Sequence, residues 1–538
     1  MSEPTHNVFL LSGIRAPFDA PESDIIQQAE TKMKRACGSS AAGLHFRLYK
    51  KSFDARRREN ILQVCSVLVM SDRSLDLAPA PDLRPFEVAV PHVERGSAPL
   101  SAPPLVVGMG PAGLFAALML AEQGYAPVLI DRGDDVDTRA TLTERFRTGG
   151  PLDTESNVQF GAGGAGTFSD GKLVTRVNDP LCNYVLERLV AFGAPADILV
   201  KAKPHVGTDI LRRVVAAVLD RITSLGGRVL YRTRLEDFEE RGDTVTVATT
   251  RGTFAAGALL LAVGHSARDT FALFARRGLM LAPKPFSVGV RIEHLRAHID
   301  RALYGRFAGH PALGPAEYAL SDTTGERGVY TFCMCPGGQV VTAASEEGGV
   351  VVNGMSCHAR DGVNSNAALA VTVDPADVGR DISRAIAFQR DLERAAYAAG
   401  GGNYVAPVET VGDFLGAYRA TAPSTVQPTY GGGRVRVADL AAFLPDFITR
   451  GLQNGLRSFD RKLTGFADPS AVLTGVETRT SSPLRILRDE QRTAVGTRFI
   501  YPVGEGAGYA GGITSAALDG LYTALAVMAR FAPEREQA

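Results

Sequence analysis

The chain has 538 residues, of which 45% are hydrophobic and 22% charged, and its 58 lysines and arginines balance its 58 acidic residues. This length exceeds what one hydrophobic core usually supports, so we expect two or three domains, and the neutral balance gives no field that would attract nucleic acid or a membrane surface. The absence of a signal peptide, of an apolar run of spanning length, and of Cys-x-x-Cys or metal-type spacing among the six cysteines predicts a cytoplasmic protein with reduced thiols and no bound metal.

A small α+β domain is predicted for residues 1–95. Alternation of apolar and polar residues indicates the order strand, helix, strand, strand over residues 7–14, 25–36, 44–51 and 62–70. This order suggests a ferredoxin-like domain. A basic run in it is either a solvated hairpin flank or a docking surface for an anion or a partner: Lys50, Lys51, Arg56, Arg57 and Arg58. Residues 96–104, GSAPLSAPP, are predicted to be a linker.

Residues 105–133 have the pattern of a dinucleotide-binding βαβ unit: LVVGMGPAGLFAALMLAEQGYAPVLIDRG. Gly108 allows a tight turn after the first strand, Gly110 lets a pyrophosphate approach the backbone, and Gly113 lets helix and strand pack closely. The helix N-terminus supplies free N–H groups and the positive end of a dipole. Asp131 ends the second strand, where a carboxylate can meet the adenosine ribose. The alternative is an ordinary βαβ turn.

A second glycine-rich stretch, NVQFGAGGAGTFSDGKL, covers residues 157–173. Five glycines exclude the interior of a helix or strand, so we expect a loop whose N–H groups line a polar ligand; a flexible surface loop is the alternative. An amphipathic helix over 209–225 follows. The apolar run that begins at residue 259 is predicted to be a buried strand that ends at Gly264, beside the first glycine-rich turn.

Residues 282–470 alternate short strands with Gly and Pro turns and contain a helix over 378–399, so we expect an inserted, sheet-rich domain that covers the reactive end of a cofactor. The dinucleotide-binding domain would then consist of residues 105–281 and 471–538. Its second part contains FIYPVGEGAGYAGGI, an apolar strand that ends in Gly-Glu-Gly before a helix over 514–529. This second helix N-terminus is predicted to face the same ligand.

Taken together, eight motifs resemble a family of bacterial FAD-dependent dehydrogenases, which are NAD(P)/FAD-dependent oxidoreductases: YKKSFDARRR, VVGMGPAGLFAAL, SNVQFGAGGAGTFSDGKL, KPFSVGVRIEH, TFCMCPGG, GMSCHARDG, TRTSSPLRI and YPVGEGAGYAGGITSAALDG. The resemblance covers nearly the whole chain. It implies an α/β fold with a Rossmann-like FAD-binding domain of the glutathione-reductase type, and FAD in an extended form. It also implies that Glu505 contacts the ribityl–phosphate region and that the backbone of Gly512 and Ile513 faces the flavin N1–C2=O edge.

Only one G-x-G-x-x-G follows a strand, so NAD(P)H is expected at most as a transient electron donor. The FAD site is expected to comprise Gly108, Gly110, Pro111, Ala112, Gly113, Asp131, Arg132, Arg139, Gly163, Gly164, Ala165, Gly166, Thr167, Lys172, Gly264, Arg485, Gly504, Glu505, Gly511, Gly512 and Ile513.

Five residues are the candidates for catalysis: His358, Arg360, Arg291, Cys333 and Cys335. His358 is the favoured acid or base because an imidazole titrates near neutral pH, and Arg291 could hold a substrate carboxylate or a flavin phosphate. Cys333 and Cys335 are either a redox dithiol or small packing residues near the ring. On a regular strand their Cα atoms would lie about 6.5–7 Å apart, which is awkward for a disulfide and favours packing.

We therefore expect an FAD-dependent oxidoreductase, in a specialised biosynthetic pathway, that moves hydride between flavin N5 and a small organic substrate. A dehydrogenase and an NAD(P)H-fed reductase fit equally. The alternative is a flavin-containing binding protein or a tRNA-modification-type protein whose N-terminal domain recruits a partner or RNA. The neutral charge argues against nucleic acid.

Overall fold

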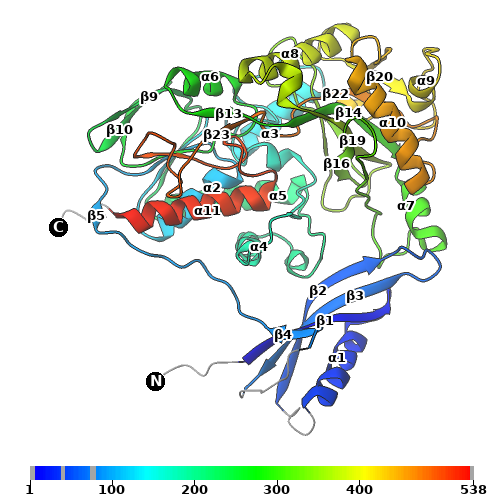
Figure 1. The fold of residues 1–538 in the computed structure, drawn as a ribbon, viewed down its shortest axis with the longest axis horizontal. Coiled ribbons are helices and arrows are strands. Elements are labelled where there is room, and N and C mark those ends of the chain that lie inside the picture. The colour runs from blue at the N-terminus through cyan, green and yellow to red at the C-terminus, as the bar shows by residue number, and fades with distance from the viewer. Residues whose placement is uncertain (1–6, 38–42, 73–79, 534–538) are drawn as a thin grey trace.

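Three hydrophobic cores organise the computed structural model, which describes residues 7–37, 43–72 and 80–533. The smallest lies in the N-terminal domain, the largest surrounds a parallel sheet, and the third surrounds an antiparallel sheet (Figure 1). The chain is a mixed α/β protein. Figure 1 shows the N-terminal domain set apart from a body that the other two cores form.

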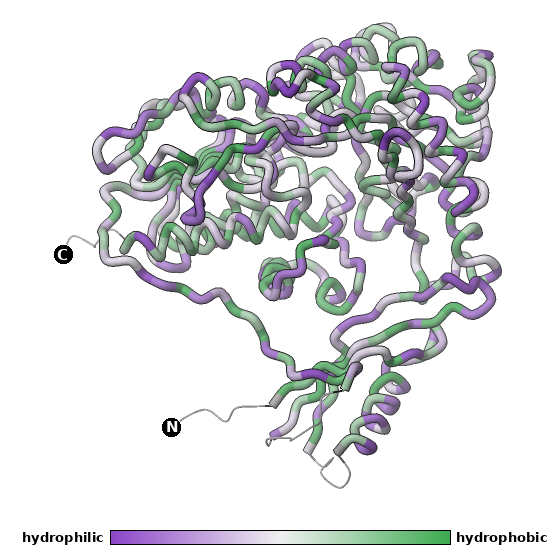
Figure 2. The backbone as a smooth tube through the Cα atoms, in the orientation of Figure 1, coloured by the Kyte–Doolittle hydropathy of each residue, from purple (hydrophilic) through white to green (hydrophobic). Residues whose placement is uncertain are grey.

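The N-terminal domain is a four-stranded antiparallel sheet with the order β2-β3-β1-β4, packed against one helix. Because β3 lies between β1 and β2, the first three elements form a split βαβ unit. Hydrophilic residues of the helix lie on the side that faces away from the sheet (Figure 2). The elements are β1 (Asn7–Pro17), α1 (Glu22–Cys37), β2 (Leu44–Asp54), β3 (Leu62–Ser71) and β4 (Leu83–Pro85).

Backbone hydrogen bonds join both the N-terminal domain and the segment that follows it to the body. Lys51, in the basic run, donates its N–H to Val200 O over 2.8 Å and accepts from the N–H of Ala202 over 2.8 Å, so part of this run contacts the same chain. The segment predicted to be a linker also differs from expectation. Residues Ala98–Pro99 (β5) pair in parallel with Phe531–Ala532 (β25), and this pairing fastens the segment to the C-terminal end.

A parallel sheet with the order β24-β12-β6-β7-β8 forms the centre of the largest core. Four of its strands are buried on both faces, which explains their continuous apolar sequences. The helix α11 packs against α2 so closely that a Cβ on Gly520 would collide with Ala112 O (Figure 1). The elements are β6 (Leu105–Val107), α2 (Pro111–Glu122), β7 (Val128–Ile130), β8 (Arg228–Leu230), β12 (Leu259–Leu261), β24 (Ile500–Pro502) and α11 (Ile513–Arg530).

Smaller elements surround this sheet. They include the expected amphipathic helix and a three-stranded antiparallel sheet. Their bounds are α3 (Val136–Arg147), η2 (Ala165–Phe168), α4 (Cys182–Ala191), η3 (Ala196–Leu199), α5 (Thr208–Ser224), β9 (Leu235–Arg241), β10 (Thr244–Thr249), β11 (Gly252–Ala256), α6 (Arg268–Arg276), and the pair β13 (Leu281–Pro283) and β23 (Leu484–Ile486).

The third core is built on a seven-stranded sheet with the order β15-β16-β19-β14-β22-β20-β21. Its strand β22 extends to Glu477, so the predicted boundary at residue 470 is too early. The bounds are β14 (Phe286–Leu295), α7 (Arg296–Tyr304), η4 (Gly305–Phe307), β15 (Ser321–Asp322), β16 (Val329–Cys335), β19 (Asn364–Val373), η5 (Pro375–Val378), α8 (Ile382–Ala399), β20 (Ala406–Thr410), α9 (Val411–Leu415), η6 (Tyr430–Gly432), β21 (Val435–Val437), α10 (Asp446–Lys462) and β22 (Val472–Glu477), with the separate pair β17 (Gln339–Thr342) and β18 (Val352–Met355). We call residues 286–477, which contain these elements, the cap.

Candidate FAD-binding site

A cavity of about 300 Å³ lies at the carboxyl ends of β6, β7, β12 and β24. Ligands of open α/β sheets bind at this edge. The cavity continues to the cap, because residues of β16, β18 and β22 also line it. Most of the predicted cofactor residues line it: Gly108, Gly110, Pro111, Ala112, Asp131, Arg132, Gly164, Ala165, Gly166, Lys172, Gly264, Glu505, Gly511, Gly512 and Ile513.

The first glycine-rich turn has the geometry that its spacing predicts. Gly108 has a φ of +107°, and a Cβ there would collide with Ala262 O. A Cβ on Gly113 would collide with Gly108 O, so this glycine serves the packing of helix on turn and does not line the cavity. The helix α2 begins at Pro111 without a side-chain cap, so its first N–H groups remain available to a ligand.

Asp131 ends β7 and is 8% exposed at the cavity wall. Its Oδ2 accepts the N–H of Met109 over 2.8 Å and its Oδ1 accepts the N–H of Gly133 over 2.9 Å. The carboxylate therefore braces the glycine-rich turn. Because a carboxylate oxygen accepts more than one hydrogen bond, it keeps acceptor capacity for a ribose hydroxyl.

Arg132 lies at the same end of the cavity. Its guanidinium pairs with Glu155 over 2.9 Å and with Asp269 over 2.5 Å, and it lies 4.5 Å from the centre of the Phe160 ring. Its charge is thus matched within the protein, and the side chain forms part of the wall rather than a free anion-binding group.

Arg139 is 0% exposed and braces the second glycine-rich segment from behind. It donates to Asn157 O over 2.8 Å, to Val158 O over 2.9 Å, to Ala162 O over 2.6 Å and to Gly161 O over 3.3 Å. Burial lowers the pKa of this guanidinium to about 9, the nearby Asp131 notwithstanding. The prediction that Arg139 contacts the cofactor is therefore replaced by a supporting role, since it does not line the cavity.

Four other predicted cofactor residues also lie outside the cavity lining. Gly163 and Thr167 pack on each other, because a Cβ on the glycine would collide with the threonine Oγ1. Gly504 donates its N–H to Asp519 Oδ2 over 2.7 Å and packs against Ala112. Arg485 lies 5.1 Å from the centre of the Tyr509 ring. These residues shape the site through packing.

The N-terminus of α11 forms the opposite wall. Gly511 and Gly512 have nothing within 4 Å of where a Cβ would stand, and among the described residues no side chain caps the helix at Gly512. Glu505 lies beside them, and burial raises the pKa of its carboxyl to about 7, although Lys284 acts in the other direction. Bare backbone and a half-buried carboxyl thus face the same space.

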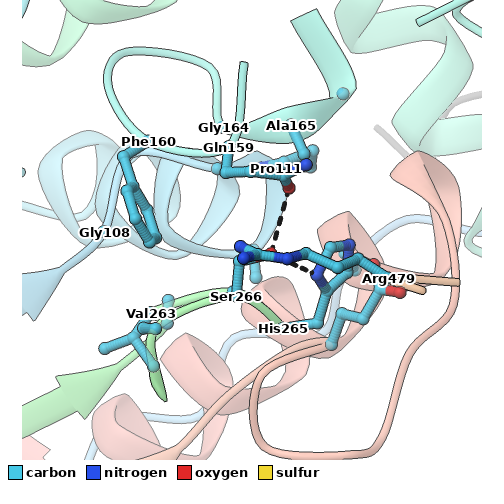
Figure 3. A pocket seen from close by; sticks show the side chains of 18 of the residues that line it. Gly108, Pro111, Gln159, Phe160, Gly164, Ala165, Val263, His265, Ser266 and Arg479 are labelled. Carbon is cyan, nitrogen blue, oxygen red and sulfur yellow. Dashed lines mark hydrogen bonds between the residues drawn. The ribbon is translucent and has the colours of Figure 1, made fainter. Parts of the chain in front are cut away.

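Figure 3 shows a polar group at the wall that the sequence prediction missed. The Ser266 hydroxyl lies between Gln159 Oε1, to which it donates over 3.1 Å, and His265 Nδ1 at 2.9 Å. Burial lowers the pKa of His265 to about 4, so its imidazole is neutral. Arg479 lies beside it (Figure 3) and is held by Glu393 over 3.1 Å. His265 and Ser266 lie in the sequence GHSARD, Arg479 in TRTSSPLRI and Gln159 in the second glycine-rich stretch, but none of these sequences indicates which side chain faces a ligand.

The cap end of the cavity is lined by Cys333, Asn353 and Glu477. Behind them Arg291 is 0% exposed; it pairs with Glu477, donates to Asn353 Oδ1 over 2.8 Å and donates to Cys333 O over 2.8 Å. Arg291 therefore positions three wall elements and does not itself line the cavity, contrary to its predicted role as a direct anion contact.

His358 and Arg360 lie in a separate cluster and do not line the cavity, so the structure does not support the prediction that they are catalytic. His358 Nδ1 lies 3.0 Å from Val206 O, and its ring stacks on that of His205 with 5.1 Å between centres. Arg360 pairs with Asp170. Lys172 joins this cluster to the cavity, because it lines the wall while its Nζ lies 3.0 Å from Asp170 Oδ2.

Electrostatics keep the buried acid of this cluster ionised. Burial acts against the charge of Asp170, but Lys172 and Arg360 outweigh it and lower its pKa to about 2. The cluster is therefore a fixed ion network.

Comparison with known proteins supports a flavin site. Residues 285–480 match the family described as FAD-dependent protein, C-terminal domain-like. A protein of Clostridium beijerinckii (strain ATCC 51743 / NCIMB 8052) is 44% identical over 492 residues, which cover 90% of this chain and 92% of the relative. The chain belongs to this family of FAD-dependent proteins.

Solved structures that resemble this FAD-dependent protein share little sequence with it. They include CtdE in complex with FAD (10% identity, TM-score 0.32, covering 80% of this chain and 86% of that one). Glycine oxidase from Geobacillus kaustophilus has 14% identity and a TM-score of 0.33, covering 80% of this chain and 95% of that one. A mutant of halogenase PltM in complex with FAD has 13% identity and a TM-score of 0.39, covering 80% and 71%.

The residues present fit an FAD. Gly264, Gly511 and Gly512 line the cavity with open space where a Cβ would stand, so a large flat ligand can lie directly on the backbone. Two uncapped helix N-termini suit the negative charges of pyrophosphate and reduced flavin.

In the described part of the chain no group of three or more His, Cys, Asp or Glu residues is placed to hold a metal ion. None of the described helices combines the length and apolar character that spanning a bilayer requires.

Proposed function

We propose that this protein is an oxidoreductase that binds FAD in extended form across the cavity and exchanges hydride between the flavin and a small organic substrate. One observation carries this proposal: the N-termini of α2 and α11, more than 400 positions apart in the sequence, open into the same cavity. Such a pair of helix ends suits a dinucleotide that carries negative charge at its centre and, when reduced, at its ring. From this pair of helix ends we infer an FAD site of the glutathione-reductase type.

Each end of the cavity has its own part in this proposal. The turn from Gly108 to Ala112 would hold the pyrophosphate, Asp131 the adenosine ribose, and Glu505 the ribityl–phosphate region. Gly512 and Ile513 would donate backbone N–H groups to the flavin ring. Bound FAD would supply two-electron chemistry that no side chain of the protein provides.

The substrate would enter at the cap end, where Lys172, Cys333, Asn353, Glu477 and Arg479 line the wall. Their charges are matched by neighbouring groups, so the wall orients a polar molecule through fixed hydrogen-bonding groups and excludes water. The described residues form a single parallel sheet of the dinucleotide-binding kind, and the proposal assigns that sheet to FAD. NAD(P)H would therefore reach the flavin by transient docking.

Purification tests the first half of the proposal: the protein should be yellow and release FAD on denaturation. Gly512→Val should lower FAD affinity at least tenfold without changing the thermal stability of the flavin-free protein. Its φ of 169° is extended backbone that valine adopts, and its Cβ position is open. Gly242, in the exposed turn between β9 and β10, has a φ of +63°, so valine would strain the backbone there and Gly242→Val cannot serve as a control. Gly511→Ala, at the same cavity wall as Gly512, is therefore the milder companion variant.

An anaerobic screen tests the second half. Bleaching of the flavin by NADH or NADPH would support a reductase, and bleaching by a metabolite alone would support a dehydrogenase. A colourless protein that also fails to bind added FAD would refute the proposed function.

A further inference from the structure

The two cysteines of the Cys-x-Cys segment do not lie on a regular strand. The strand β16 pairs with β19 up to Phe332 and resumes at Cys335, so the two residues between them form a bulge. Cys333 in this bulge has a φ of +44°, a left-handed conformation that non-glycine residues rarely adopt. The Cα separation expected for alternate residues on a regular strand, which disfavours a disulfide, therefore does not apply to Cys333 and Cys335.

The bulge brings the two thiols together and gives them different exposure. The Cys335 sulfur lies 3.3 Å from Cys333 O, and its thiol also hydrogen-bonds to the Cys333 side chain. Cys333 lines the cavity, whereas Cys335 is 0% exposed behind it. Of the two cysteines, Cys333 is therefore the one that a molecule in the cavity contacts, and Cys335 lies beside it out of contact with solvent.

Two cations lie near Cys333, each paired with an acid: Arg291 with Glu477 and Lys172 with Asp170. Arg291 donates to Cys333 O over 2.8 Å, and Lys172 lines the same cavity. The hydrogen bond from Cys335, reinforced by Arg291 and Lys172 against the effect of burial, lowers the pKa of Cys333 below its usual value. Hydrogen bonding to Cys333 and burial raise the pKa of Cys335 well above its usual value. A thiolate facing the cavity with a protonated thiol behind it is the arrangement of an attacking and a resolving cysteine.

We propose that Cys333 and Cys335 form a redox-active dithiol that exchanges with a small-molecule disulfide in the cavity. The Cys333 thiolate attacks one sulfur of the disulfide, whose S–S bond breaks, and one thiolate leaves. Cys335 then loses its proton and attacks the Cys333 sulfur, which releases the second thiolate and forms the Cys333–Cys335 bond. The substrate gains the two electrons that the protein sulfurs lose, and the proton released by Cys335 together with one proton from water converts the two released thiolates to thiols.

This inference deepens the proposed function, because reduced flavin would be the two-electron donor that restores the dithiol. It names disulfides as the substrate class of the cap end. The thiol exchange itself requires no flavin, so it can be measured in flavin-free protein.

The test uses glutathione disulfide on the full-length protein after mild reduction. In wild type the number of thiols titrated after denaturation should fall from six to four, with a matching loss of two hydrogens by intact mass and a cross-link between Cys333 and Cys335 by peptide mapping. Cys335→Ser should instead trap glutathione on Cys333. Cys333→Ser should form neither product, and Cys357→Ser, which removes an exposed thiol, should behave as wild type.

A stable glutathione adduct on wild-type Cys333 without the internal disulfide would overturn the inference, and so would a reaction confined to Cys357. If a serine variant fails to fold, peptide mapping of the wild type still decides, since it locates the disulfide without any substitution. Flavin content is measured on the same samples. A protein that contains flavin but forms no Cys333–Cys335 disulfide refutes the dithiol alone. A protein that forms the disulfide but binds no FAD refutes the proposed function alone.

Discussion

Replacing Arg139 tests whether the second glycine-rich segment depends on a single buried cation. Arg139→Met keeps an unbranched apolar stem but removes all four hydrogen bonds to backbone oxygens. Three of them are between 2.6 and 2.9 Å, and a bond from a charged donor contributes about 1.5 kcal/mol or more. The loss in unfolding free energy should therefore be about 4 kcal/mol, reduced somewhat because a buried charge is also removed.

The assay is urea unfolding of the flavin-free protein, followed by titration with FAD. We expect weaker FAD binding in Arg139→Met even at temperatures where it is folded, because Gly164 and Gly166 lose their support. Arg139→Lys should have a stability and an FAD affinity between those of wild type and Arg139→Met, because lysine has three donors and cannot span four carbonyls. Arg145→Met, on the exposed face of the same helix, is the matched control. Equal stability of Arg139→Met and Arg145→Met would refute the reasoning.

Three further changes have defined outcomes. Glu505 has a pKa raised by burial to about 7, so the flavin-free protein should lose stability as pH rises from about 4.5 to 7. The loss should be about 3 kcal/mol in unfolding experiments and Glu505→Gln should abolish it, whereas an unchanged pH profile would contradict the burial argument. Asp170→Asn leaves Lys172 and Arg360 without their shared carboxylate and should cost about 3–5 kcal/mol at pH 7. Because the pKa of Asp170 is lowered to about 2, the difference between the two proteins should shrink as pH falls from about 4 towards 2, as chemical denaturation can show. Ser266→Ala should weaken FAD binding severalfold with little change in stability if the Gln159–Ser266–His265 group orients the ligand, and calorimetry that finds unchanged affinity would exclude such a role.

Local patterns were sufficient to locate the elements that line the sheet end of the cavity. Gly108, Gly110 and Gly512 lie where their spacing predicted, because a tight turn and a helix N-terminus are determined by backbone conformation over a few residues. Short apolar runs likewise became the buried parallel strands, since burial on both faces leaves no polar positions.

Tertiary structure alone decided which side chains face the cavity from the cap. Asn353, Glu477 and Arg479 reach it because β18 and β22 converge there, and no short-range pattern records that meeting. Arg139 and Arg291 were predicted as ligand contacts but became internal braces, because their partners come from distant loops and strands. The bulge at Cys333 depends on pairing with β19, and a single strand's alternation cannot reveal where its partner skips residues. The sequence thus determined the conformations set by neighbouring residues, and the fold determined the contacts between residues far apart in the chain.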